Sequence, residues 1–218
     1  MHVKTYSYRF AEEILQHPRY ASAYNELLTI CQDCPLPVYS DKSEKQSSKD
    51  VVQQLMNSYF LMRFRLFGWE EEPLATPDNQ EDALRSDFRK TFINEDGELL
   101  TLQVEVEFGN VASSYRNYFK FQLSFSYDLT DICVLIVPSQ HLCNRIDSGV
   151  SNFEKTIREI PSAKLSITVP TLVIGLFDIG VVAWDVKSIE PNLDILKKTR
   201  KEFFDEHYTI VENYINSL

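Results

Sequence analysis

The stretch Leu99–Gln122, LLTLQVEVEFGNVASSYRNYFKFQ, decides the fold that we predict for this chain. Its first half alternates apolar and polar residues like a strand, and helical spacing follows a Gly-Asn break. The alternation puts Glu105 and Glu107 on the same face of the strand. Two neighbouring carboxylates repel each other, so the pair indicates either a cation site or a solvated face.

A turn upstream of this strand fixes the register of a hairpin. Asn94–Gly97, NEDG, is typical of a type I turn followed by a glycine with positive φ. The resulting three-residue loop pairs the first turn residue with Glu98. Followed outward, the same register places Asp87 opposite Glu105, with Glu107 two residues farther along that face.

The three acids predict a magnesium site. Directly opposed residues have Cβ atoms about 5 Å apart, which suits two carboxylates that share a divalent cation. We expect Asp87, Glu105 and the backbone carbonyl of Val106 to hold Mg²⁺. Glu107 is expected to be catalytic as well, either as a further ligand or as the group that orients or deprotonates water.

Composition limits the class of protein. The chain has 218 residues, 44% of them hydrophobic and 25% charged, as in one globular domain. Apolar runs are too short to cross a membrane, and acids interrupt the N-terminal segment, so we expect no export. A net charge of −10 counts against DNA binding by a basic surface, although a cleft needs only local positive charge.

The four cysteines are expected to be free thiols in a reducing cytosol, which predicts a cytoplasmic protein. Cys31 and Cys34 have CxxC spacing. Together with His141 and Cys143 they leave a zinc site open as an alternative.

The order of elements predicts a single α/β domain, in which a central mixed sheet with the antiparallel hairpin is flanked by helices. We expect N-terminal helices within residues 1–34, a mobile polar loop at 40–49, a core at 50–190 and a C-terminal helix at 193–217. In the helix from Ala112 to Tyr127, the spacing of the apolar residues predicts that Tyr115 and Phe119 face the core.

Several blocks of this sequence resemble the BglII/BstYI group of type II restriction endonucleases, in the PD-(D/E)xK superfamily. The blocks are Asp87-Phe88, VEVEFGN at Val104–Asn110, Lys120-Phe121-Gln122 and VLIVP at Val134–Pro138. The segment QQLMN from Gln53 and Gly68-Trp69-Glu70 are similar as well. The resemblance extends over roughly Asp50 to Leu176, and its VEVxFGN block is the most specific part.

The resemblance implies a restriction endonuclease-like fold and a type II site-specific deoxyribonuclease. The implied reaction is Mg²⁺-dependent double-strand cleavage of a short palindromic DNA site by phosphodiester hydrolysis, leaving a 5′ overhang. A cognate DNA methyltransferase is expected in the same restriction-modification system, without being a physical partner. The resemblance also implies a homodimer, because a two-fold symmetric protein most simply makes two cuts at a two-fold symmetric site. The helices from Asp50 and from Ala112 are the candidate interfaces.

The family pattern assigns the same acids that the hairpin register selects. Its first metal ligand matches Asp87 and its second carboxylate matches Glu105. Glu107 stands where most of the superfamily has lysine, BglII-like members have glutamine and the BamHI branch has glutamate. This departure leaves open whether Glu107 is a metal ligand or the general base.

Five residues are candidates for contact with DNA. Asn110 matches the asparagine of the family's FGN block and is expected at a base edge. Arg116 and Lys120 lie one helical turn apart and are candidate phosphate contacts. The segment that begins at Ser139 and ends at Asn152 lies where the family places recognition residues. An asparagine suits adenine, which it bonds bidentately.

Two other functions remain compatible with the sequence. The first is a sequence-specific DNA-binding module on the same fold that has lost catalysis. The second is an acidic domain without nuclease activity, in which Glu105 and Glu107 belong to a solvated face.

Overall fold

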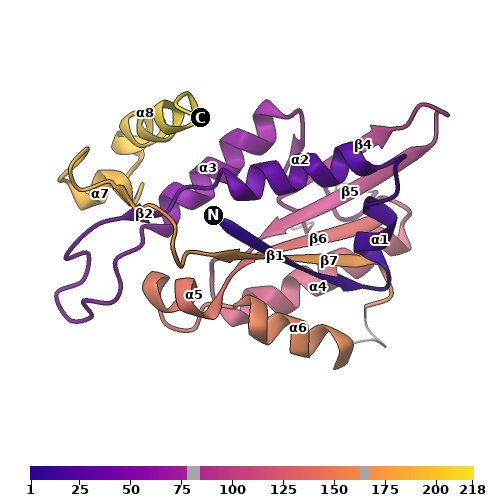
Figure 1. The fold of residues 1–218 in the computed structure, drawn as a ribbon, viewed down its shortest axis with the longest axis horizontal. Coiled ribbons are helices and arrows are strands. Elements are labelled where there is room, and N and C mark those ends of the chain that lie inside the picture. The colour runs from indigo at the N-terminus through magenta and orange to yellow at the C-terminus, as the bar shows by residue number, and fades with distance from the viewer. Residues whose placement is uncertain (78–83, 163–166) are drawn as a thin grey trace.

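The computed structural model describes residues 1–77, 84–162 and 167–218, and it contains a mixed sheet with helices on both faces (Figure 1). Six strands pair in the order β1-β7-β6-β5-β4-β3. In that order they are His2–Tyr8, Thr171–Phe177, Ile132–Pro138, Leu99–Val106, Phe88–Ile93 and Glu70–Glu71. A separate parallel pair joins β2 (Pro37–Val38) to β8 (Trp184–Asp185).

The helices complete the layers. They are α1 (Ala11–Leu15), α2 (Ala21–Gln32), α3 (Gln53–Leu66), α4 (Val111–Ser126), α5 (Gln140–Ile146), α6 (Phe153–Ser162), α7 (Leu193–Leu196) and α8 (Phe204–Ile215), with a 3₁₀ turn at Lys201–Phe203. The fold class is the predicted one, a mixed sheet within a single α/β arrangement.

Alternating residues of the central strands belong to two separate cores. In β6, Val134 and Ile136 pack with residues of α1, α2, α3 and α8, whereas Leu135 and Val137 pack with residues of α4 and α6. The period-two alternation of a strand therefore divides the helices into two layers, one on each face of the sheet.

The predicted hairpin is confirmed. The backbone N–H of Asn94 donates to the carbonyl of Glu98, and Gly97 has a φ of 81°. The strands β4 and β5 pair antiparallel, and their register includes Phe88 opposite Val104. Beyond the hairpin, β5, β6 and β7 run parallel, so their carboxyl ends meet at one edge of the sheet.

Three predicted elements differ from the structure. Residues His2–Tyr8 are not helical but form β1, which pairs antiparallel with β7. The C-terminal helix is interrupted between α7 and α8. The segment after Pro138 contains the helix α5. Residues 40–49 form neither helix nor strand, as predicted, and their mobility stays a prediction.

No described helix is both long and apolar enough to cross a membrane. All four cysteines are free and buried. Within the described ranges, no three acid, histidine or cysteine side chains converge as a metal site, so the zinc alternative has no support.

Candidate active site at the carboxyl end of β5

The structure brings Asp87 to the end of β5, as the hairpin register predicts. Asp87 directly precedes β4, and its Oδ2 accepts a hydrogen bond from the backbone N–H of Val106 at 2.7 Å. Burial raises the pKa of Asp87 above its ordinary value, against the opposing effects of this hydrogen bond and of Lys120. A partly buried carboxylate that resists ionisation is therefore fixed beside the strand.

Glu105 is the most deeply buried of the three acids, with 1% of its surface exposed. Its Oε2 pairs with Nζ of Lys120, whereas its Oε1 is buried without a hydrogen-bond partner among the described residues. Burial and the neighbouring Asp87 raise the pKa of Glu105, although Lys120 opposes them. An unpartnered buried oxygen is costly unless another group satisfies it.

Lys120 reaches this acid because α4 turns a polar face toward the sheet. Asn117, Lys120 and Ser124 are buried, whereas Tyr115 and Phe119 are 55% and 60% exposed. The prediction that Tyr115 and Phe119 face the core is therefore wrong. Apolar spacing does not predict this orientation, because the inward face of the helix meets carboxylates.

Glu107 is held in another way. Its Oε1 accepts a hydrogen bond from the backbone N–H of Gly109 at 2.7 Å, and its Oε2 accepts one from Nδ2 of Asn117 at 3.0 Å. Burial raises its pKa above the ordinary value. Because each oxygen of Glu107 accepts a hydrogen bond, the side chain connects the end of β5 to the following turn and to α4.

A cavity of about 310 Å³ opens beside Asp87 and Val106. We call it the acid cavity. It is bounded by β4, the end of β5, α3 and the segment around β3, and its lining residues are Asn57, Phe60, Leu61, Glu71, Glu72, Asp87, Phe88 and Val106. Its carboxylates and the adjoining backbone supply the oxygen atoms that Mg²⁺ prefers.

The donor set fits Mg²⁺, although no complete cluster of ligands is assembled within the described residues. Magnesium in proteins is commonly held by one or two carboxylates and keeps several waters, so it needs no all-protein cage. Asp87, the carbonyl of Val106 and the unpartnered Oε1 of Glu105 match that requirement.

Comparison with known proteins identifies the family of this chain. A family model described as "Restriction endonuclease BglII/BglIII" matches residues 3–176. The chain belongs to this family. Among curated protein sequences, none matches it.

Solved structures of the BglII restriction endonuclease share the fold. A crystal structure of BglII complexed with a DNA 16-mer aligns with a TM-score of 0.63 and 16% identity, covering 81% of this chain and 78% of that one. A crystal structure of free BglII aligns with a TM-score of 0.50 and 14% identity, covering 81% and 79%. At these identities the likeness establishes the fold of this BglII-family chain.

The residues expected to contact DNA lie in different settings. Asn110 and Arg116 are exposed, and Asn110 forms a bridge with Val150 that joins the turn after β5 to the loop before α6. Lys120, in contrast, is buried and pairs with Glu105. Its expected contact with a phosphate stays a prediction, and its position restricts that contact to a phosphate bound beside the acids.

Ser139 and Asn152 serve as helix caps. The Oγ of Ser139 accepts from the backbone N–H of Leu142, and Oδ1 of Asn152 accepts from the backbone N–H of Lys155. Both residues are buried, with 1% and 6% of their surfaces exposed. Because these groups are already engaged at the starts of α5 and α6, the structure does not favour either as a base contact.

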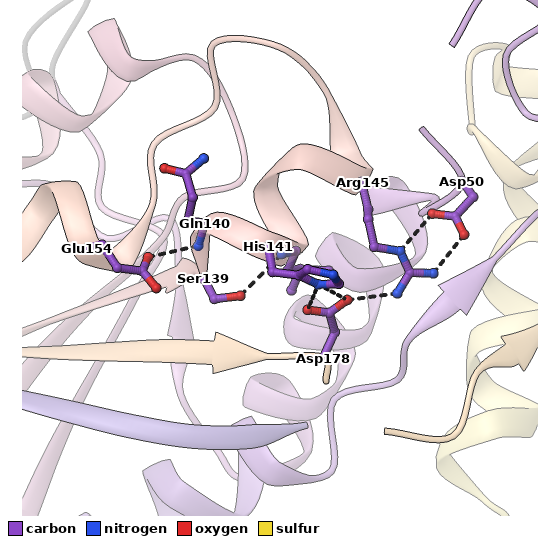
Figure 2. Close-up of polar contacts among 8 residues, drawn as sticks. Asp50, Ser139, Gln140, His141, Arg145, Glu154 and Asp178 are labelled. Atoms are coloured by element: carbon purple, nitrogen blue, oxygen red, sulfur yellow. Dashed lines mark hydrogen bonds and ion pairs between the residues drawn. The ribbon is translucent and has the colours of Figure 1, made fainter. Parts of the chain in front are cut away.

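A polar network beside these caps was not anticipated from the sequence (Figure 2). Asp178, which follows β7, has a fully buried side chain that pairs with His141 at 2.9 Å and with Arg145 at 2.7 Å. Arg145 also forms a bidentate pair with Asp50. Burial opposes ionisation of Asp178, but Arg145 and His141 hold its pKa below the ordinary value. The network fixes α5 between the start of α3 and the end of β7.

Proposed function

We propose that this chain is a type II restriction endonuclease that hydrolyses phosphodiesters in both strands of a short palindromic DNA site, with Mg²⁺ as cofactor and a 5′ overhang as product. The observation that carries the proposal is the convergence of Asp87, Glu105 and Lys120 at the end of β5, where Asp87 also lines the acid cavity. Membership of a restriction endonuclease family supports the reaction class.

Asp87, Glu105 and the carbonyl of Val106 would hold the cation. When bound, Mg²⁺ supplies Lewis acidity toward the scissile phosphate and lowers the pKa of a coordinated water. The two carboxylates are fixed by the backbone of β5 and by α4, so they need little rearrangement to bind it.

Lys120 places a positive charge next to Glu105 inside a buried site. There it partly offsets the repulsion between the two carboxylates. It would also stabilise negative charge that develops on the phosphate during attack by water. A lysine on α4 thus supplies a cation to the site even though Glu107 stands where most of the superfamily has lysine.

We assign Glu107 a positioning role. Each of its oxygens accepts a hydrogen bond, one from Gly109 and one from Asn117, so the carboxylate holds the turn after β5 against α4. Its carboxylate fixes the turn that carries Asn110 toward DNA. Asn110 and the exposed Arg116 remain our proposed contacts to DNA.

The outer face of α4 is the proposed dimer interface. Tyr115 and Phe119 are large, more than half exposed and one helical turn apart on α4, and the half-exposed Tyr127 directly follows the helix. The other candidate, α3, buries most of its large apolar residues in the core of its own chain, although Leu66 at its end is exposed. An α4 interface leaves the carboxyl edge of the sheet free for DNA.

The test is incubation of plasmid and phage DNA with the pure protein and Mg²⁺, followed by run-off sequencing of the ends. Discrete cutting with 5′ overhangs is expected from the wild type. Glu105→Ala should cut at least about a thousandfold more slowly, and the matched variant Glu107→Gln about tenfold more slowly.

Undiminished cutting by Glu105→Ala would contradict the proposed site. Sequence-specific binding without cutting at any Mg²⁺ or Mn²⁺ concentration would instead identify a DNA-binding module. If Glu107→Gln were as inactive as Glu105→Ala, the positioning role would be wrong.

A further inference from the structure

A second cavity lies at the same edge of the sheet as the acids. It has a volume of about 330 Å³ and opens between the loop before α3, the start of α3 and the ends of α5 and α7. Its charged side chains are Lys42, Lys49 and Lys197 and one carboxylate, that of Asp147. We call it the lysine cavity. On a chain with a net charge of −10, an excess of ammonium groups in one hollow favours an anionic ligand.

Lys42 forms the fixed wall of the lysine cavity. Its Nζ donates to the backbone carbonyls of Val51 at 2.5 Å and Ile146 at 3.0 Å, and an ammonium group has three donors. Burial, with Lys197 nearby, lowers the pKa of Lys42 to about 8. A bound anion would therefore stabilise the charged form of this side chain.

Lys49 and Lys197 lack the partners that other lysines have. Both are partly buried, yet neither has a carboxylate within ion-pair distance in the ranges that the structure describes. In contrast, Lys90 pairs with Glu26 at 2.7 Å and Lys187 pairs with Asp41 at 3.1 Å. Lys49 and Lys197 are thus not ion-paired, and the three ammonium groups of the lysine cavity exceed its single carboxylate.

The lysine cavity connects to the acid cavity along one face of α3. A third hollow, lined partly by Lys198, shares Gln54 and Lys197 with the lysine cavity. It shares Asn57 and Leu61 with the acid cavity. Gln54 and Leu61 are seven positions apart, which is about 10 Å along a helix. DNA advances about 3.4 Å per nucleotide along its axis, so this distance corresponds to about three nucleotides.

The walls of the lysine cavity are held by the network of Figure 2. Arg145 joins α5 to Asp50, three residues before α3, and its carbonyl accepts from the backbone N–H of Val51. The cavity therefore belongs to the packed fold, even though Lys42 and Lys49 lie on an irregular loop.

We propose that the lysine cavity binds a backbone phosphate of the DNA strand that follows α3, about three nucleotides from the phosphate that is cut. The inference rests on the proposed function, because that function places the scissile phosphate at the acid cavity. The phosphate site anchors the strand at a second point and so fixes its direction across the acids.

The test compares Lys49→Gln/Lys197→Gln with the wild type and with Lys45→Gln/Lys201→Gln. The control removes the same charge from exposed lysines outside the lysine cavity, and Lys42 is left in place because it bonds the backbone. Affinity is measured by fluorescence anisotropy in Ca²⁺ over a range of salt, on a duplex with the mapped cut site and on a 30-base-pair duplex of mixed sequence.

We expect the cavity variant to reduce the slope of log affinity against log salt by about 1 for each bound protomer, with little change in the control. A single neutral methylphosphonate about three nucleotides from the cut should weaken binding by the wild type. The same substitution should not weaken binding by the cavity variant further.

Equal slopes for the cavity variant and the control would overturn the inference. Inorganic phosphate could instead stabilise the wild type but not the cavity variant, while the two salt slopes for DNA stay equal. That result would assign the cavity to a free anion. If the wild type binds DNA with the expected slopes but never cuts, the proposed function fails and the phosphate site stands.

Discussion

At the scale of single residues, Glu105 carries the features from which we propose a cation site. Folding removes its carboxyl group from water and places Asp87 near it, and the only satisfied oxygen is the one beside Lys120. The folded protein therefore holds a proton on Glu105 to a higher pH than the unfolded chain does. Without metal, this group makes the fold less stable as pH rises from about 4.5 toward 8.

The raised pKa of Glu105 predicts how Mg²⁺ binding depends on pH. Because the cation must displace a proton, the affinity for Mg²⁺ should rise by up to about tenfold between pH 6 and pH 7 and level off above pH 8. Thermal denaturation at a series of Mg²⁺ concentrations measures this affinity at each pH. Glu105→Gln should bind weakly at every pH, and a wild-type affinity that is constant from pH 6 to 8 would contradict the assignment.

At the scale of elements, the features that depend on interactions between residues close in sequence were predicted correctly. The NEDG turn sets the β4–β5 register within a few residues, and that register located Asp87 beside β5. The strand β1 was missed because its partner β7 lies more than 160 positions away, and its pairing depends on tertiary structure. A signal for α5 was present: Ser139 is a good N-cap, and Leu142, Cys143 and Ile146 have helical spacing.

The rest of the site depends on packing that no local pattern records. The buried face of α4 carries Asn117, Lys120 and Ser124 beside Tyr118 and Phe121, so the spacing of the apolar residues alone predicted the wrong orientation for the helix. The network around Asp178 joins residues from three distant segments. A network between distant segments can be identified only when the positions of the strands and helices in the fold are known.

Arg145 offers a test of how α5 is held. Arg145→Met removes the bidentate pair with Asp50 and leaves the buried Asp178 with only His141. We expect a loss of about 3 kcal/mol in the free energy of unfolding, measured by urea denaturation. Arg116→Met, on the exposed side of α4, should change stability by no more than about 0.5 kcal/mol. Equal stabilities for the two variants would show that the network contributes nothing to holding the helix.

At the scale of the whole molecule, the exposed face of α4 is the dimer interface that we propose. The double variant Tyr115→Glu/Phe119→Glu adds charge to the proposed interface and should convert the dimer to a monomer at micromolar concentration. Sedimentation equilibrium measures the mass. The double variant Ile179→Glu/Val182→Glu alters exposed apolar residues after β7 and should remain dimeric. Dissociation by the second variant alone would move the interface away from α4.

The direction of β5 has a practical consequence. Its eight residues separate the NEDG turn from the acids by about 26 Å, and the turn stands at the far end of the sheet from the carboxyl edge (Figure 1). A fluorophore or a fused domain attached at Glu95 would therefore lie far from the proposed DNA site. The hairpin that positions Asp87 and Glu105 thus also offers an attachment point for single-molecule measurements of the DNA binding that we propose.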